Sequence, residues 1–124
     1  MKKRILSPER LRKVPPQFSW IDHRLVQENY FTRCIHCSWT LYLFLASVAD
    51  VDGLSYYSDA SLMRRLKMDE LQLSLSRRQL IQNGLIAHQK PLYQVLSLDR
   101  AQEQPRSGHA SVAEILRKAL GGQP

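Results

Sequence analysis

The stretch RRQLIQNGLI, residues 77–86, turns from a helical pattern directly into an apolar pair. The change falls at Asn83 and Gly84. Helices often end on a glycine because the residue after the last turn takes a left-handed conformation, which glycine adopts at little cost. The stretch therefore predicts a helix that ends at about Asn83. A strand follows at once, and its apolar side chains are expected to pack back against the same core.

Upstream of this stretch, the sequence predicts a short helix, a tight turn and a longer helix. Ser58 or Asp59 caps the short helix, and Lys67 and Met68 form the turn. Asp69 then caps the longer helix, because its side chain can accept a hydrogen bond from a backbone N–H group of the first turn. The side chains expected to face the core from these helices are Leu62, Met63, Leu66, Leu73, Ser76, Leu80 and Ile81.

The remaining elements follow from apolar periodicity and from turn residues. Residues 32–53 are apolar nearly all round, which predicts a helix at the centre of the core. The other segments are expected to be a strand or extended lead-in over 18–26, strands over 54–57, 85–88 and 92–98, and a hairpin turn over 89–91. The predicted order is helix, strand, helix, helix, strand, strand.

This order resembles a winged helix-turn-helix domain over about residues 36–98. The matching pieces are the SDASLMRRL helix, the KMD turn, the ELQLSLSRRQLIQNG helix, the GLI exit and the QKP wing. In this family the glycine reverses the chain at the end of the recognition helix. The stretch FSWIDHRLV before LYLFL further resembles the winged-helix domains of bacterial plasmid replication initiators. The resemblance implies a mainly α fold with a small β wing, in a transcription regulator or a replication factor of a mobile element.

The domain organisation is expected to have four parts. They are a basic N-terminal arm over 1–17, a winged-helix domain over 18–99, a linker over 100–110 and an amphipathic C-terminal helix over 111–121. At about ten residues the last helix is too short to be stable alone. It is therefore expected to dock on its own domain, on a second copy in a homodimer, or on another protein.

The charge of the chain favours a polyanionic partner. The 124 residues carry a formal net charge of +7, which points to nucleic acid first and to an anionic membrane surface second. The longest apolar stretch is far shorter than the ~18 residues of a membrane-spanning helix. No apolar segment follows the basic residues at the start, so a secretory signal is not expected and the sequence predicts a cytoplasmic protein.

The resemblance implies that the helix over 69–83 enters the major groove of double-stranded DNA with its N-terminal half. Arginine pairs with guanine, glutamine with adenine, and serine with either base. The residues expected to contact bases are Gln72, Ser74, Arg77 and Arg78. The residues expected to contact phosphates are Lys2, Lys3, Arg4, Arg10, Arg12, Lys13, Arg64, Arg65, Lys67 and Lys90.

Leu71 and Leu75 do not fit the inward face of this helix. Either they are exposed, against thymine methyl groups or a partner protein, or the helix is rotated from this assignment. A second hypothesis is therefore a protein–protein adaptor that uses these two leucines and the C-terminal helix, since a fold does not determine a function. A third is RNA binding through the basic arm.

No catalytic site is expected. Cys34 and Cys37 form a CxxC pair, but a zinc site needs two further ligands at a suitable spacing and a redox pair needs a βαβ context. Two partly buried thiols at the start of the core helix are the simpler interpretation. A nucleophile motif, a glycine-rich phosphate loop and paired carboxylates are absent from the sequence, which predicts a non-catalytic protein without a cofactor.

Overall fold

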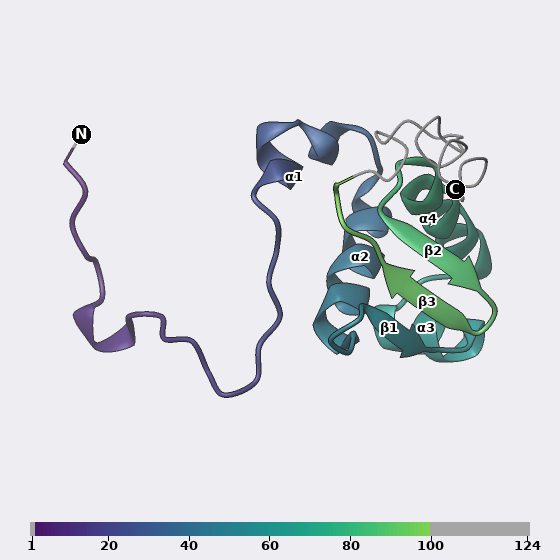
Figure 1. Cartoon of the computed structure of the whole chain (residues 1–124), viewed down its shortest axis with the longest axis horizontal. Helices are drawn as coiled ribbons and strands as arrows, with labels where there is room; N and C mark the ends of the chain where they lie inside the picture. The colour runs from purple at the N-terminus through teal and green to yellow at the C-terminus, as the bar shows by residue number, and fades with distance from the viewer. Residues whose placement is uncertain (1, 100–124) are drawn as a thin grey trace, which may run out of the picture.

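The computed structural model describes residues 2–99. The predicted linker and C-terminal helix lie outside these residues. The described chain has an extended N-terminal segment and a body of helices against a small sheet (Figure 1). The element bounds are η1 Pro8–Arg10, α1 Arg24–Gln27, η2 Tyr30–Thr32, α2 His36–Val48, β1 Leu54–Tyr56, α3 Asp59–Leu66, α4 Glu70–Gln82, β2 Ile86–Gln89 and β3 Leu92–Val95.

Residues 2–99 thus form a mixed α/β fold with four α-helices and a three-stranded antiparallel sheet. This arrangement is compatible with a helix pair followed by a β-hairpin wing. Within the same residues, no helix has the length and apolar character needed to cross a membrane.

The core forms where α2 packs on α4 and on β3. Leu41 and Leu45 from α2 meet Leu73 and Leu80 from α4, and all four are at most 1% exposed. Burying one such side chain contributes about 1.5–3 kcal/mol. The prediction that the apolar helix lies at the centre is confirmed, although α2 is shorter than the expected 32–53.

The sheet has the strand order β1-β3-β2, with both pairs antiparallel. The hairpin of β2 and β3 supplies two strands, and β1 joins its open side. Just before β1, Gly53 has a φ of +85°, and a Cβ at this position would lie 2.6 Å from the carbonyl oxygen of Val95. Its own carbonyl accepts a 2.8 Å hydrogen bond from the Val95 N–H. Gly53 therefore allows the loop after α2 to approach β3 closely.

The predicted helix ends are confirmed in most details. Ser58 caps α3, and its hydroxyl accepts from the Ser61 N–H at 3.1 Å. Asp69 caps α4, and the turn between the helices has Lys67 in the left-handed region at φ +54°. Gly84 has a φ of +71°, as the opening stretch predicted.

Three expectations are corrected. Of the two alternatives for 18–26, residues 18–22 form the extended lead-in and not a strand, and the short helix α1 begins at Arg24, whose N–H donates to Asp22 Oδ1 at 2.9 Å. β3 ends at Val95 rather than Leu98, although one further hydrogen bond continues the pairing with β2, from the Leu96 N–H to the carbonyl of Leu85 at 3.0 Å. Ile81 is 43% exposed and does not face the core.

We predict that Leu80→Ala lowers the free energy of unfolding by about 2–5 kcal/mol, because it leaves a cavity between α2 and α4. Ile81→Ala, the neighbouring change on the outer side of the same helix, is the control and costs less than about 1 kcal/mol. Chemical denaturation of both variants measures the difference. Equal losses would mean that α4 is rotated from its position here.

Candidate nucleic-acid interface

The helix pair α3–α4 and the hairpin turn carry the residues that were expected to contact DNA. The turn between the helices is fixed from inside by Met68, which is 7% exposed. The N-terminus of α4 is held by a capping box, in which the Gln72 N–H donates to Asp69 Oδ1 at 2.7 Å. In return, the Asp69 N–H donates to Gln72 Oε1 at 2.9 Å. The start of α4 is therefore a rigid and well-positioned structure.

Gln72 has a structural role that the sequence interpretation did not assign. Its side chain is exposed, but its carbonyl oxygen is used in the capping box. Bidentate pairing with adenine needs both the oxygen and the nitrogen of the amide. The capping box occupies one acceptor position of this oxygen and holds the amide in one orientation, so a bidentate base contact by Gln72 would compete with the box.

Arg77 was expected on the outward face of α4, and the structure corrects this placement. Its guanidinium donates to Asp59 Oδ1 at 2.9 Å and to the hydroxyl of Tyr93 at 2.7 Å. The side chain is only 17% exposed. A contact between Arg77 and a base would require breaking these bonds.

The spacing of α4 explains why Arg77 lies inward. Leu73 and Leu80 are buried, and position 77 lies one turn from each on the same face of the helix. That face meets the N-terminus of α3 at Asp59 and the middle of β3 at Tyr93. The 73–77–80 spacing was visible in the sequence. Its two partners are 18 and 16 residues away and could not be identified before the fold was known.

Arg77, Asp59, Tyr93 and His88 form one partly buried group, which we call the α3–α4 latch. The hydrogen bonds from Arg77 hold the pKa of the Asp59 carboxyl below its usual value. Burial raises the pKa of Tyr93, and its hydroxyl stays protonated at neutral pH. The ring of His88 stacks on that of Tyr93, with 4.3 Å between centroids. Burial, aided by the Arg77 charge, lowers the pKa of His88, so this ring is neutral at pH 7.

The outward face of α4 consists of the residues left after the core and the latch are accounted for. Arg78 is exposed, as expected, whereas Ser74, which was also expected to face outward, is half-buried. Of the two leucines that did not fit the inward face, Leu71 is 74% exposed and Leu75 is half-buried. Arg78 is therefore the one arginine of α4 whose side chain is directed to solvent.

The expected phosphate contacts fall into two separate groups. Arg64, Arg65 and Lys67 are exposed at the end of α3, and Lys90 is exposed at the tip of the hairpin. The second group comprises Lys2, Lys3, Arg4, Arg10, Arg12 and Lys13, all exposed on the N-terminal segment. This segment runs away from the body (Figure 1), so the structure does not bring the two groups together.

The net charge of the chain is carried largely by this segment and not by the body. Residues 36–99 contain six basic and six acidic side chains, and are neutral overall. Residues 1–33 contain eight basic and three acidic side chains. Attraction of the protein to a polyanion therefore depends more on the N-terminal segment than on the helix pair.

The cysteines lie where the simpler interpretation placed them. Cys34 is buried, Cys37 is half-buried, and both are free thiols. Asn83 Nδ2 lies 3.5 Å from the Cys34 sulfur. Burial raises the pKa of the Cys34 thiol. Across residues 2–99, no three His, Cys, Asp or Glu side chains gather in a group suited to a metal ion.

Comparison of the chain with known protein families, with the curated proteins and with solved structures gives no match.

We predict that Arg77→Met lowers the free energy of unfolding by about 1–3 kcal/mol, the usual loss for a hydrogen bond to a charged group. Methionine keeps much of the packing of the arginine stem. Arg78→Met, one residue along, is the control and changes stability by less than about 0.5 kcal/mol. Urea denaturation of the two variants at neutral pH measures both values. A stability for Arg77→Met equal to that of the control would show that the latch does not stabilise the fold.

We also predict that stability falls as the pH drops below about 6.5, the ordinary pKa of histidine. Because the pKa of His88 is lowered in the folded protein, the unfolded chain takes up a proton first and is favoured. His88→Gln removes this contribution. The difference in unfolding free energy between pH 7.5 and 5.5 should therefore be smaller in this variant than in the unchanged protein. The exposed His36→Gln variant is the control, and an unchanged pH dependence in His88→Gln would contradict the prediction.

Proposed function

We propose that this protein binds double-stranded DNA in a sequence-specific manner through a winged-helix domain, without catalysis. In this proposal α4 is the recognition helix, the hairpin of β2 and β3 is the wing, and the protein acts as a small transcription regulator or as a replication accessory factor of a mobile element. The observation that carries the proposal is the free outward face of α4. Leu71 and Arg78 are exposed there and Ser74 is half-buried, next to the C-terminal end of α3, where three basic residues are exposed.

The geometry supports different roles for neighbouring residues of α4, some in contacting bases and others in holding the helix in place. Arg78 and Ser74 are available for hydrogen bonds to base edges, and Leu71 is available for the methyl group of thymine. Arg77 holds α4 against α3 and the sheet through the latch. The capping box limits what Gln72 offers to a base. Specificity is therefore proposed to depend mainly on Arg78 and Ser74.

The charge distribution indicates that different parts of the protein provide specificity and affinity for DNA. A neutral body gains little from the general attraction of DNA for cations. The basic N-terminal segment, which has room to follow phosphates or to enter a minor groove, supplies most of this attraction. Arg64, Arg65, Lys67 and Lys90 orient the body on the backbone.

A protein–protein adaptor is the second candidate function, and the exposure of Leu71 favours it. A leucine that is 74% exposed at the start of a helix is available to an apolar pocket of a partner. Asp69 and Glu70 beside it repel phosphate but would not repel a neutral or basic protein surface. The two candidates therefore make opposite predictions for a charge reversal on α4.

The test measures binding to labelled duplex DNA by fluorescence anisotropy. The first duplex has a mixed sequence, and the second carries a site recovered by selection from random duplexes. We expect Arg78→Glu to weaken binding to the selected site by at least about tenfold, the value of a good arginine–guanine pair. The loss should be smaller on mixed-sequence DNA. Arg33→Glu, which makes the same change of charge outside α4, is the matched control.

The arm is tested separately by its effect on the dependence of binding on salt. Reversing Arg10, Arg12 and Lys13 to glutamate should weaken binding to all duplexes alike. It should also lower the slope of log affinity against log salt, by about 0.9 for each phosphate that the arm no longer neutralises. If Arg78→Glu binds the selected site as the unchanged protein does, α4 is not the recognition helix. If the unchanged protein binds no duplex at low salt, the adaptor function takes precedence, with Leu71→Ser as its first variant.

A further inference from the structure

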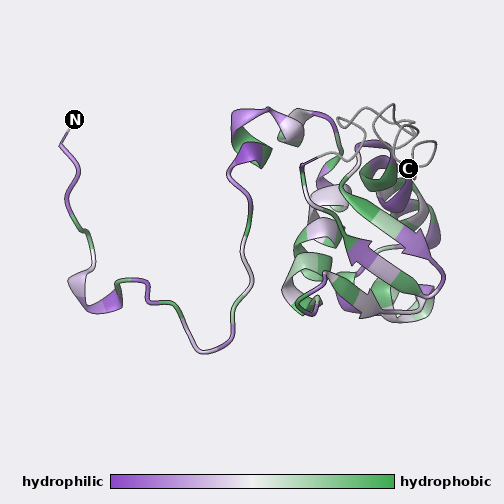
Figure 2. Ribbon diagram, in the orientation of Figure 1, coloured by the Kyte–Doolittle hydropathy of each residue, from purple (hydrophilic) through white to green (hydrophobic). Residues whose placement is uncertain are grey.

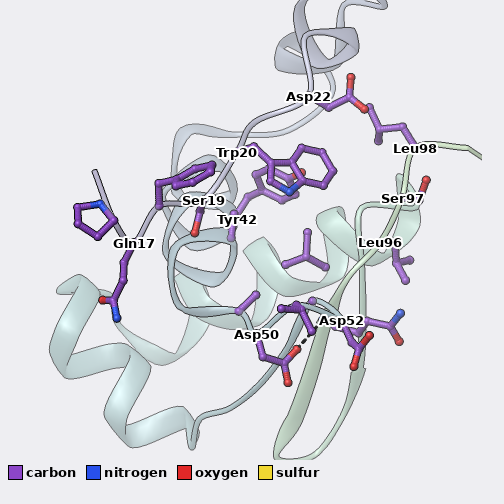
Figure 3. Close-up of a pocket in the computed structure, with 18 residues that line it drawn as sticks. Gln17, Ser19, Trp20, Asp22, Tyr42, Asp50, Asp52, Leu96, Ser97 and Leu98 are labelled. Carbon is purple, nitrogen blue, oxygen red and sulfur yellow. Dashed lines mark hydrogen bonds between the residues drawn. The ribbon is translucent and has the colours of Figure 1, made fainter. Parts of the chain in front are cut away.

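A groove of about 890 Å³ lies between the N-terminal segment and the body, beside the C-terminal half of α2 (Figure 3). One wall is the segment over 16–20, and α2 contributes Tyr42, Ala46 and Ala49. The loop over 50–53 and the chain over 94–98 complete it. Phe18 and Trp20 line the groove and are 64% and 74% exposed, so the groove is apolar but open.

The charge of the groove is entirely acidic. Its lining includes Asp22, Asp50 and Asp52 and contains no lysine or arginine. Asp22 is paired with Arg24 at 2.7 Å. Asp50 and Asp52 are exposed, and in the part of the chain that the structure describes neither forms a salt bridge. The groove thus carries two uncompensated negative charges beside an aromatic wall.

The N-terminal segment has the complementary character. Hydrophobic residues alternate with hydrophilic ones along it (Figure 2). Ile5, Leu6, Leu11 and Val14 are between 55% and 85% exposed. The six basic residues of the segment lie among them, with Glu9 the one acidic side chain. Four large apolar side chains exposed on one short segment are available to an apolar surface of a partner.

The segment is poorly arranged to fill the groove of its own copy. Residues 16–20 already form one wall, and the chain before them leads away from the body (Figure 1). A return into the same groove would require a reversal at Pro15 and Pro16. The ring of each proline fixes φ, and the residue before a proline is held in an extended conformation. The preceding residues are therefore directed away from the groove of their own copy (Figure 1).

We propose that residues 4–14 of one copy dock in the groove of a second copy, and that the two copies exchange these segments in a closed dimer. Exchange by a twofold axis uses the same two surfaces twice and leaves none open, as in most soluble homo-oligomers. Leu11 and Val14 pack against the apolar wall, and Arg10, Arg12 and Lys13 lie opposite Asp50 and Asp52. Lys2 and Lys3 remain outside the groove. The inference does not rest on the proposed DNA binding.

A charge-swap experiment on the full chain tests the exchange. One variant carries Arg10→Glu, Arg12→Glu and Lys13→Glu on the segment. The other carries Val51→Lys and Asp52→Lys in the groove. Both sets of positions are exposed, and Asp50 is left unchanged because its carboxylate accepts hydrogen bonds from the Asp52 and Leu54 N–H groups. Analytical ultracentrifugation at several concentrations measures the oligomeric state.

The unchanged protein should be a dimer whose dissociation constant rises with salt, because exposed charges are screened. Each variant alone should dimerise at least tenfold more weakly. An equimolar mixture should regain the dimer as a heterodimer, because both of its pairings again join opposite charges. The control is Gln27→Lys with Glu28→Lys, two exposed positions at the C-terminal end of α1 with the same change of charge as the groove variant. It should dimerise like the unchanged protein.

Three results would overturn the proposal. The first is an unchanged protein that stays monomeric at about 100 μM, because the dissociation constant would then be higher than a specific interface of this kind should have. The second is a dimer that both variants retain, which would place the interface elsewhere. The third is a pair of variants that are monomeric alone and in mixture. To test the apolar part independently of charge, Leu11→Ser with Val14→Ser should weaken the dimer to a similar degree, and no weakening would equally contradict the proposal.

Discussion

The packing of α2 on α4 is the contact on which the other features of this protein depend. Small residues allow the two helices to approach, since Ser38 and Ser76 are both fully buried. Gln79 joins them, because its Oε1 accepts from the Ser38 hydroxyl and from the Ile35 N–H, both at 2.8 Å. This contact sets the rotation of α4 and so decides which of its residues are buried. Tyr42 and Ala46, on the neighbouring face of α2, line the groove.

The rotation of α4 separates two arginines that are adjacent in the sequence. Arg77 faces α3 and β3 and connects three elements through the latch, whereas Arg78 faces solvent. A recognition helix needs this kind of support, because a base contact is specific only when the side chain starts from a rigid backbone. The latch also places a neutral histidine beside a partly buried ion pair. The stability of the helix pair is thereby coupled to pH.

The positive charge lies on the N-terminal arm, whereas the folded body is neutral, and this affects both the proposed DNA binding and the proposed dimer. A neutral body with a basic, partly apolar arm can use the arm in two ways, on phosphates or on the acidic groove of another copy. The two uses share Arg10, Arg12 and Lys13, so dimer exchange and non-specific DNA attraction compete for the same side chains. Lys2 and Lys3 at the end of the arm are the residues left for phosphate when the arm is exchanged.

The sequence by itself determined the order of the elements from α2 to β3 and several of the helix ends, because caps, turn residues and apolar periodicity act over a few residues. Ser58, Asp69 and Gly84 were located correctly for this reason. It also located the exposed basic positions, since charged side chains without a partner stay in solvent. Only the tertiary structure decided the roles of Arg77 and Ile81, the joining of β1 to the hairpin and the existence of the groove. Each of these depends on residues distant in the chain, such as Asp59 and Tyr93 around Arg77. Local sequence patterns do not predict which distant side chains the fold will bring together.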